Sequence, residues 1–254
     1  MERSSISRSV EILKLLADGI NRFSDIMENL VLSKSTTHRL LKKLESSELV
    51  VQDPITKKYY LSSLILMLAS RPGVSHQQVI LCALNEIKQL QGLVDETIMI
   101  LVRVGTHKVI IEEFPSRHEI KYSQGKGFCG PIYTGASGKL LLSELNDHDL
   151  HLLLDNIPLE PVGPNTITCR KQLITELEKI RKQGFALSYG ERIAGSASVS
   201  VPIKTPFSPY ALTVMGPDSR FNPLEITGDL KYYAQKISAK FKSTHLETKN
   251  SSHA

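Results

Sequence analysis

The spacing of apolar residues divides the first 65 residues of the chain into three short helices and a β-hairpin. Apolar side chains recur at three- and four-residue steps in residues 7–17, 24–30 and 33–47, which is the period of an amphipathic helix. β-branched and aromatic residues then surround the turn-forming sequence "DPITKK", which predicts a hairpin. Three helices followed by a hairpin are typical of a winged helix-turn-helix unit, which is too small to be the whole protein.

The apolar side of the first helix and two helix caps follow from the local sequence. In the first helix, the three- and four-residue steps place Val10, Leu13 and Leu16 or Ala17 on one apolar side. Ser24 and Ser33 are the expected N-caps of the second and third helices, because a serine hydroxyl can accept a hydrogen bond from an amide of the first turn.

The rest of the chain mixes helical and strand patterns. A helical segment in "SSLILMLASRPG" ends at a joint formed by Arg-Pro-Gly, and "VILCALNEIKQLQGL" is a second amphipathic helix. Two strands are expected around Gly105-Thr106, and later strands in "FALSYG", "SASVSVPI" and "YALTVMG". Helices are expected in "GASGKLLLSEL", in "QLITELEKIRKQG" and from Pro223 to about Phe241. This order predicts an α+β fold with an antiparallel sheet.

These patterns predict the following domain organisation. A winged helix-turn-helix domain occupies residues 1–64, a linker helix 65–76 and a second, α+β domain 77–243. Residues 244–254 are polar and without pattern, and we expect them to form a disordered tail.

Composition and charge narrow the class of protein. A net charge of +5 inclines the chain towards anionic partners. Three isolated cysteines, with no CxxC and no Cys/His pair at metal-ligand spacing, favour a reduced cytoplasm and predict neither a metal site nor a cofactor. The chain has no unbroken apolar run of about 18 residues, and its first residues lack the core of a signal peptide. We therefore expect a soluble cytoplasmic protein with no membrane partner.

The third helix has two faces with different composition. A helical projection of residues 34–46 gathers leucines on one side and places Ser35, Arg39, Lys42 and Ser46 on the opposite side. A charged face on an isolated helix is usually only hydrated surface. Here a short helix and a turn precede it and a basic wing follows, which is the arrangement that enters the major groove of DNA.

This arrangement defines the candidate DNA-binding residues. Arginine can read guanine, serine and threonine can contact bases or phosphates, and lysine neutralises phosphate charge. We expect Arg39 and Ser35 to read bases, and Lys42, His38 and Lys58 to touch the backbone. The full set is Lys34, Ser35, Thr36, His38, Arg39, Lys42, Lys57, Lys58 and Tyr59.

Several segments resemble a known family. "SRSVEILKLLADG", "SKSTTHRLLKKLESSELV" and "DPITKKYYLSS" resemble the DNA-binding domain of IclR-type bacterial transcription regulators. "TGASGKLLLSEL", "PNTIT", "RKQGFALSYGERIAGSASVSVPI" and "GPDSRF" resemble landmarks of that family's GAF-like effector domain, so the likeness covers about residues 6–241. The resemblance implies a homo-oligomer, a dimer or a tetramer, that binds a double-stranded DNA operator and a small-molecule effector, often a carboxylate. It also implies a repressor or an activator that is not an enzyme.

The same resemblance implies an effector pocket between the sheet and its covering loops. Ser198 stands where a cysteine is common in the family, and Ser188 and Met215 replace more polar or acidic residues, so no effector is carried over from a relative. From the residues themselves, "GASG" can present free backbone N–H groups to an anion and the serines of "SASVSV" point to one face of a strand, although small residues also permit tight packing. The matched pocket positions are Ala136, Ser137, Ser188, Glu191, Ser196, Ser198, Thr213 and Met215.

Two other classes of protein remain as alternatives. An enzyme fused to a DNA-binding head needs a Cys/His or acid pair beside the pocket, yet no motif places a histidine or an acid near Cys129, which we interpret as structural. His107 and His118 are expected in exposed loops. A pure protein-interaction module would lack the steep salt dependence of phosphate neutralisation.

Overall fold

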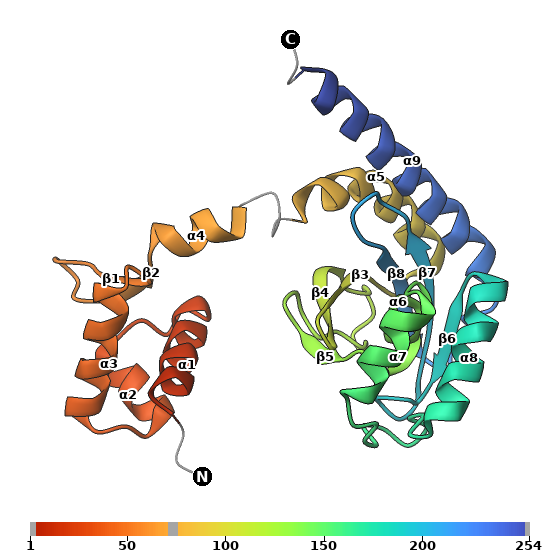
Figure 1. The fold of residues 1–254 in the computed structure, drawn as a ribbon. Helices are drawn as coiled ribbons and strands as arrows, with labels where there is room; N and C mark the ends of the chain where they lie inside the picture. Colours follow the sequence, from red (N-terminus) through yellow and green to blue (C-terminus); the bar gives the residue numbers. More distant parts are fainter. Residues whose placement is uncertain (1–3, 71–75, 252–254) are drawn as a thin grey trace. The chain divides into compact units, whose positions relative to one another are not determined.

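The computed structural model of the chain describes residues 4–70 and 76–251, and Figure 1 shows how these residues fold. The chain divides into two compact units, residues 1–75 and 76–254. The expected linker helix, residues 65–76, is described only as far as Ser70, and residues 71–75 lie outside the described part.

The N-terminal unit is three helices and a small wing. A two-stranded antiparallel sheet pairs Val50 with Leu61 and Gln52 with Tyr59, which confirms the predicted hairpin. One further helix follows the wing. The elements are α1 (Ser5–Ala17), α2 (Phe23–Leu30), α3 (Lys34–Ser46), β1 (Val50–Gln52), β2 (Tyr59–Leu61) and α4 (Ser63–Ser70).

The buried side of α1 agrees with the prediction in part. Leu16 is buried and Leu13 packs partly buried against the core, but Val10 is 45% exposed and the fully buried Ile12 was missed. Apolar residues occupy six of the eight positions from Val10 to Ala17, so more than one face of this helix is apolar and the spacing alone does not separate them. The four-residue pair Ile12 and Leu16 packs against the leucines of α3.

One of the two predicted N-caps is confirmed. The Ser33 hydroxyl accepts a hydrogen bond from the backbone N–H of Thr36 at 3.3 Å. The Ser24 prediction is wrong, because α2 begins at Phe23 with Arg22 as its N-cap, and the Ser24 hydroxyl donates to Asp25 instead.

The C-terminal unit is built on a six-stranded antiparallel sheet with the order β5-β4-β3-β8-β7-β6. Val104 pairs with His107 across the two-residue turn, which confirms the expected hairpin at Gly105-Thr106. The strands are β3 (Thr97–Val104), β4 (His107–Phe114), β5 (Cys129–Pro131), β6 (Ala186–Tyr189), β7 (Ser196–Ile203) and β8 (Tyr210–Pro217).

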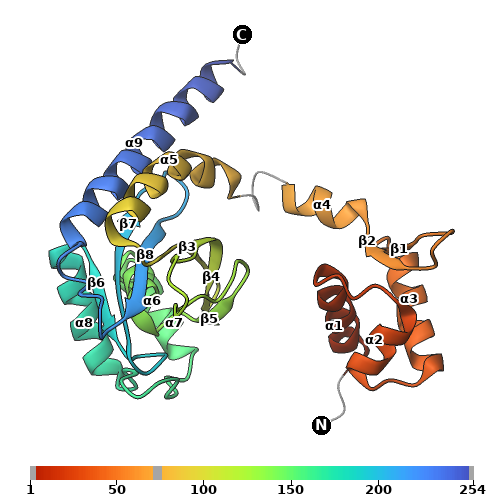
Figure 2. The same cartoon turned by 180° about the vertical axis from the view of Figure 1, so that it is seen from behind.

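Helices cover both faces of this sheet, so the unit has three layers (Figures 1 and 2). The alternation of β7 shows how one strand serves both faces: Ala197, Val199 and Val201 enter the core shared with α5 and α9. The serines between them face α6 on the other side. One layer is α5 (Gln77–Val94) with α9 (Thr227–Ser251), and the other is α6 (Gly135–Ser143), α7 (Asp147–Asp155) and α8 (Arg170–Gln183).

The last helix extends further than the sequence predicts. Phe241 is the last residue of α9 in the core among those whose side chains are described, as expected from the apolar pattern, but the helix continues to Ser251 through residues predicted to be a disordered tail. Neither Gly nor Pro occurs after Gly228, so no residue type that ends helices interrupts it.

No helix in the described ranges, 4–70 and 76–251, combines the length and the apolar character that crossing a membrane requires.

Candidate functional site

The two faces of α3 are separated as the projection predicts. Thr37, Leu40, Leu41 and Leu44 are buried in the core of the N-terminal unit. Ser35, His38, Arg39, Lys42, Lys43 and Ser46 are exposed. The leucines therefore hold the helix in place while the polar side chains stay available to a partner.

The free chain already uses some of the polar groups on this face. The Ser33 hydroxyl lies 3.2 Å from that of Ser35 and donates to the Thr36 hydroxyl at 2.9 Å. Lys42 forms an ion pair with Glu45 at 2.8 Å, and this hydrogen bond raises the pKa of Lys42. Among the described residues, no ion pair or hydrogen bond involves the guanidinium of Arg39, so this group is available for a new acceptor.

The wing presents basic residues on a structured turn. The Asp53 carboxylate accepts hydrogen bonds from the backbone N–H groups of Thr56 (2.7 Å) and Ile55 (2.8 Å), and these bonds lower its pKa. Lys57 adopts a positive φ of 58° and is exposed, while Lys58 is half-buried. The turn therefore holds two lysines at the tip of the wing.

Tyr59 is not available as a surface contact. Its side chain is 4% exposed and packs in the core with Val50 and Leu44, so this candidate is corrected to a core residue. Tyr60, which the sequence analysis passed over, points to the opposite face of the same strand and is 41% exposed. Successive residues of a strand point to opposite faces, so the pattern "YYL" already indicates that one tyrosine is buried and the other exposed.

A pocket lies in the C-terminal unit between the sheet and α6. Seven of the eight expected pocket residues line it. Its lining is Met99, Leu101, Lys108, Gln124, Gly135, Ala136, Ser137, Ser188, Arg192, Ser196, Ser198, Thr213 and Met215.

Strand register explains why residues far apart in the chain meet in this pocket. Ser188 pairs with Ser198, and Ser198 pairs with Met215 on the next strand. Thr213 pairs with Met99 on β3. Residues paired across antiparallel strands share a face, so these rows form one floor of small hydroxyls and methionines.

Glu191 lies behind the lining rather than in it. Its carboxylate accepts a hydrogen bond from the backbone N–H of Gly135 at 3.0 Å, at the start of α6. The sequence analysis expected free N–H groups at this helix terminus, and the chain's own carboxylate occupies one of them. Ala136 and Ser137 remain on the pocket wall.

α6 approaches the rest of the unit closely because Gly138 has no side chain. A Cβ at this position would lie 2.0 Å from the carbonyl oxygen of Ile132. The second glycine of "GASG" therefore has a packing role, while the first, Gly135, adopts a positive φ of 69°.

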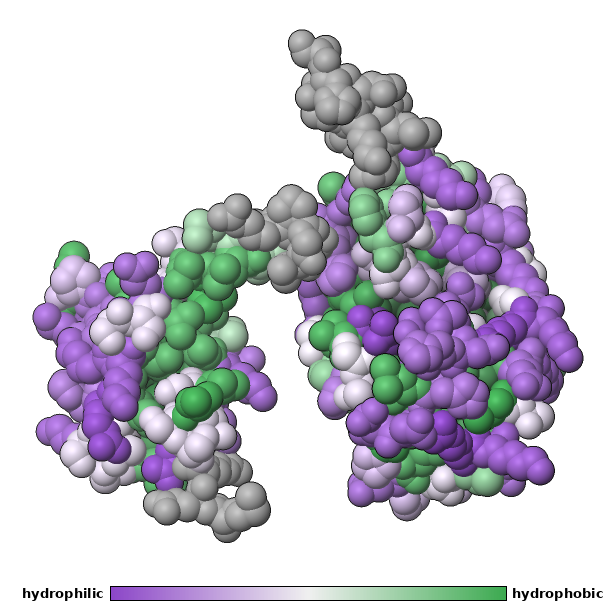
Figure 3. All heavy atoms as spheres, viewed as in Figure 1, coloured by the Kyte–Doolittle hydropathy of each residue, from purple (hydrophilic) through white to green (hydrophobic). Residues whose placement is uncertain are grey.

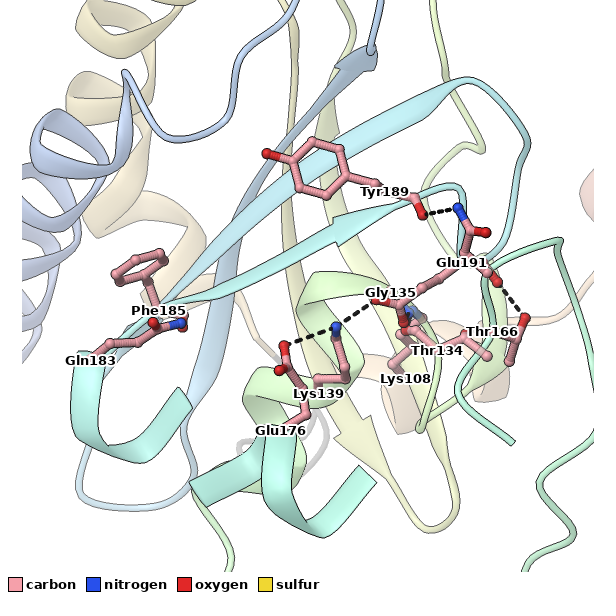
Figure 4. A network of polar contacts seen from close by, with 11 residues as sticks. Lys108, Thr134, Gly135, Lys139, Thr166, Glu176, Gln183, Phe185, Tyr189 and Glu191 are labelled. Atoms are coloured by element: carbon pink, nitrogen blue, oxygen red, sulfur yellow. Dashed lines mark hydrogen bonds and ion pairs between the residues drawn. The ribbon is translucent and has the colours of Figure 1, made fainter. Parts of the chain in front are cut away.

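A buried ion-pair network supports the wall (Figure 4). Lys139 on α6 is paired with Glu191 at 2.5 Å and with Glu176 on α8 at 3.3 Å. The Lys139 side chain is 3% exposed and that of Glu191 6%, so each charge depends on the other for compensation. The Thr166 hydroxyl donates to the backbone oxygen of Glu191 at 2.6 Å and fixes the segment that follows β6.

Two cations of the pocket were missed by the sequence analysis. Lys108 on β4 is 5% exposed and donates a hydrogen bond to the backbone oxygen of Thr134. Burial is the largest cause that lowers the pKa of Lys108, to about 7, and the neighbouring Arg192 and Lys139 lower it further while Glu191 opposes them. The guanidinium of Arg192 lies over the Phe128 ring, 4.6 Å from its centroid.

The cysteine considered for an enzyme is not part of the pocket. Cys129 is exposed at the edge strand β5 and is absent from the pocket lining, so it lies outside the candidate site. Within residues 4–70 and 76–251 no group of three or more His, Cys, Asp or Glu side chains could hold a metal ion.

Comparisons with known protein families cover nearly the whole chain. The model described as the IclR helix-turn-helix domain matches residues 5–54. The model described as the bacterial transcriptional regulator IclR C-terminal domain matches residues 73–239.

Individual relatives agree with these matches. The HTH-type transcriptional repressor AllR of Escherichia coli (strain K12) is 26% identical over 220 residues, which are 85% of this chain and 81% of AllR. The crystal structure of IclR from Thermotoga maritima has a TM-score of 0.71 at 26% identity, covering 93% of this chain and 98% of that one. An IclR homolog complexed with 4-hydroxybenzoate from Microbacterium hydrocarbonoxydans has a TM-score of 0.76 at 22% identity, covering 94% and 100%, and shows the common fold.

Proposed function

This chain belongs to the IclR family of DNA-binding transcriptional regulators with an effector-binding C-terminal domain, and we propose that the exposed face of α3 reads its operator while the pocket beside α6 controls it. The observation that carries the first part is the separation of α3 into a buried leucine side and an exposed side with Arg39 and Ser35. The DNA-binding domain of this proposal is residues 1–64 and the effector domain residues 77–243.

Arg39 and Ser35 are the proposed base readers. Arg39 is exposed and unpaired among the described residues, so a bidentate contact with guanine displaces no internal partner. Lys34, Thr36, His38, Lys42 and the wing lysines Lys57 and Lys58 contact phosphates. Lys42 exchanges its exposed ion pair with Glu45 for a phosphate oxygen at small cost, because such pairs contribute little.

The proposed working species is a homodimer or tetramer in the cytoplasm. α4 carries exposed Met67 and Leu68, and Figure 3 shows hydrophobic surface over this helix. Covering these side chains in a second copy would remove apolar area from water. A two-fold dimer would set two α3 helices in successive major grooves, with half-sites about 34–36 Å apart.

The proposed effector is a small carboxylate held in the pocket lined by Ala136, Ser137, Ser188, Ser196, Ser198, Thr213 and Met215, with Glu191 supporting its wall. The relative from Microbacterium hydrocarbonoxydans is complexed with a carboxylate, 4-hydroxybenzoate. Control of repression or activation requires that the effector bind two arrangements of the regulator with different affinity.

Selection of bound sequences from random DNA, followed by mobility-shift titration, tests the DNA-binding part. Arg39→Ala should lower affinity for the selected operator by about 5- to 150-fold and relax the preference at one base pair. Arg117→Ala, which removes an exposed arginine from the C-terminal unit, is the matched control and should bind as the parent does. Unchanged affinity and preference in Arg39→Ala would remove this residue from the interface.

A further inference from the structure

Lys108 is a buried amine that lines the pocket without a carboxylate of its own. The only hydrogen bond given by its ammonium or amine within the described chain goes to the backbone oxygen of Thr134. Lys139, one helix turn into α6, is buried to a similar degree but is paired with two carboxylates. A buried cation normally requires an anionic partner, and Lys108 differs from Lys139 in having none among the described residues.

Arg192 is a second cation of the pocket that lacks a carboxylate. No ion pair of the described residues includes its guanidinium, which is half-buried and stacked on Phe128. Its backbone is held tightly, since a Cβ on Gly163 would lie 2.7 Å from the backbone carbon of Arg192. An arginine held in this way presents a fixed set of donors to an acidic group.

The surrounding charges define what the pocket can accept. Apart from Lys108 on β4, they are Lys139 on α6, Glu176 on α8, and Glu191 and Arg192 after β6. Glu113 of β4 is occupied by the backbone N–H groups of Gln124 and Gly125. The pocket residues supplied by β3, β6, β7 and β8 do not titrate: they are Met99, Leu101, Ser188, Ser196, Ser198, Thr213 and Met215.

Lys139 is matched by Glu176 and Glu191, whereas neither Lys108 nor Arg192 is paired with a carboxylate in the described part of the chain. A bound monoanion would supply the missing opposite charge, and a proton on the Nζ of Lys108 would then be stabilised. A nearby opposite charge favours the charged form of a buried group.

We propose that Lys108 and Arg192 form the anion-binding subsite of this pocket, that the effector is a carboxylate monoanion, and that its binding brings one proton from solvent onto the Nζ of Lys108. The amine becomes an ammonium and the carboxylate stays ionised, so the complex carries no net charge beyond that of the free pocket. This proposal rests on the function proposed for the pocket and names the residues that select the effector by charge. The lowered pKa of Lys108, about 7, agrees with a buried amine that is easily deprotonated and that gains a proton more readily beside an anion.

A thermal-shift experiment with matched probes tests the subsite. The full-length protein is heated with acetate, propionate, butyrate, benzoate or 4-hydroxybenzoate, and with the corresponding uncharged amides, at constant ionic strength. At least one acid should stabilise the parent protein. The apparent affinity for the corresponding amide should be at least about tenfold weaker. Lys108→Met, which keeps the length of the buried chain, should abolish the preference for acid over amide.

Two controls make the outcomes distinct. Lys179→Met removes an exposed lysine of α8 and should leave the preference unchanged. Ser198→Leu fills the pocket and should abolish stabilisation by acids and amides alike. If an acid that Ser198→Leu loses still stabilises Lys108→Met as it does the parent, the subsite is wrong while the pocket stands. If Ser198→Leu and Lys108→Met both respond as the parent does, the proposed pocket and the proposed subsite are both wrong. The same conclusion holds if no probe distinguishes any variant from the parent.

Proton uptake is measured separately by titration calorimetry. The best acid is titrated into the protein at pH 8 in two buffers that differ in their heat of ionisation. At this pH most of the free Lys108 is an amine, so binding should take up close to one proton per site, and Lys108→Met should take up none. Binding of the acid to the parent protein without proton uptake overturns the assignment of Lys108.

Discussion

The backbone N–H of Gly135 donates a 3.0 Å hydrogen bond to the Glu191 carboxylate, which ties the first turn of α6 to the segment after β6. The other oxygen of this carboxylate pairs with Lys139 at 2.5 Å. One buried side chain therefore joins α6 to the segment that follows β6.

Glu191→Gln should destabilise the C-terminal unit by about 2–4 kcal/mol, because the amide leaves Lys139 with only the partly exposed Glu176 as a counter-charge. Urea unfolding followed by circular dichroism measures the change, since the chain has no tryptophan. Glu176→Gln is the control and should cost under about 1 kcal/mol, because its side chain is 25% exposed. Equal costs for the two variants would show that Glu191 has no special role in the wall.

Lys108 should make stability depend on pH in the alkaline range. Its pKa is about 7 in the folded chain and 10.5 ordinarily, so between these values the unfolded chain binds more protons and stability rises with pH, by up to about 1.4 kcal/mol per pH unit. Below pH 7 both states hold the proton and the contribution stops changing. The melting temperature of Lys108→Met relative to the parent should therefore be highest near pH 7 and fall towards pH 10. A difference that stays constant over this range would mean that Lys108 is charged in the fold.

Val31, in the turn between α2 and α3, adopts φ 51° and ψ 49° and is 90% exposed. A β-branched residue is strained in this left-handed region, and almost no packing would be lost on its removal. Val31→Gly should therefore stabilise the N-terminal unit by about 0.5–1 kcal/mol in thermal unfolding. Val51→Gly, in the ordinary strand backbone of β1, should instead be destabilising, and a loss of stability in both variants would refute the strain at Val31.

The salt dependence of operator binding should report the phosphate contacts. Lys34→Ala and Lys58→Ala should each reduce the slope of log affinity against log salt concentration by about 0.9 while sequence preference is kept. Lys14→Ala, an exposed lysine of α1 outside the proposed interface, should leave the slope unchanged. A slope that none of the interface variants alters would contradict the phosphate assignments.

The sequence predicts best the features that depend on local periodicity. The leucine side of α3, its Ser33 cap and the β3–β4 hairpin each follow from a spacing of two to four residues, and the structure has all of them. The prediction that Val10 is buried was wrong because the first helix has several apolar faces. The prediction that Ser24 is an N-cap was wrong because its hydroxyl has another local partner, Asp25. The distinction between Tyr59 and Tyr60 required only the strand alternation.

The pocket residues that were missed depend on contacts between distant segments. Lys108 reads as a polar residue beside a turn in "GTHKVII", and only the register of six strands places it under the start of α6. Arg192 is oriented by Gly163 and by the Phe128 ring, which are far from it in the chain. The resemblance to the IclR family supplied the other pocket positions because its motifs mark the same strands.

Release of DNA by an effector tests the central claim most directly. Operator selected from random DNA is bound to the parent protein and to Ser198→Leu, and the acids that stabilise the parent are added in a mobility-shift titration. We predict that at least one acid shifts the affinity of the parent by about tenfold or more and leaves Ser198→Leu, which binds the same operator, without response. An effector response that Ser198→Leu retains in full, or a parent protein whose operator binding no stabilising acid changes, would contradict control through this pocket.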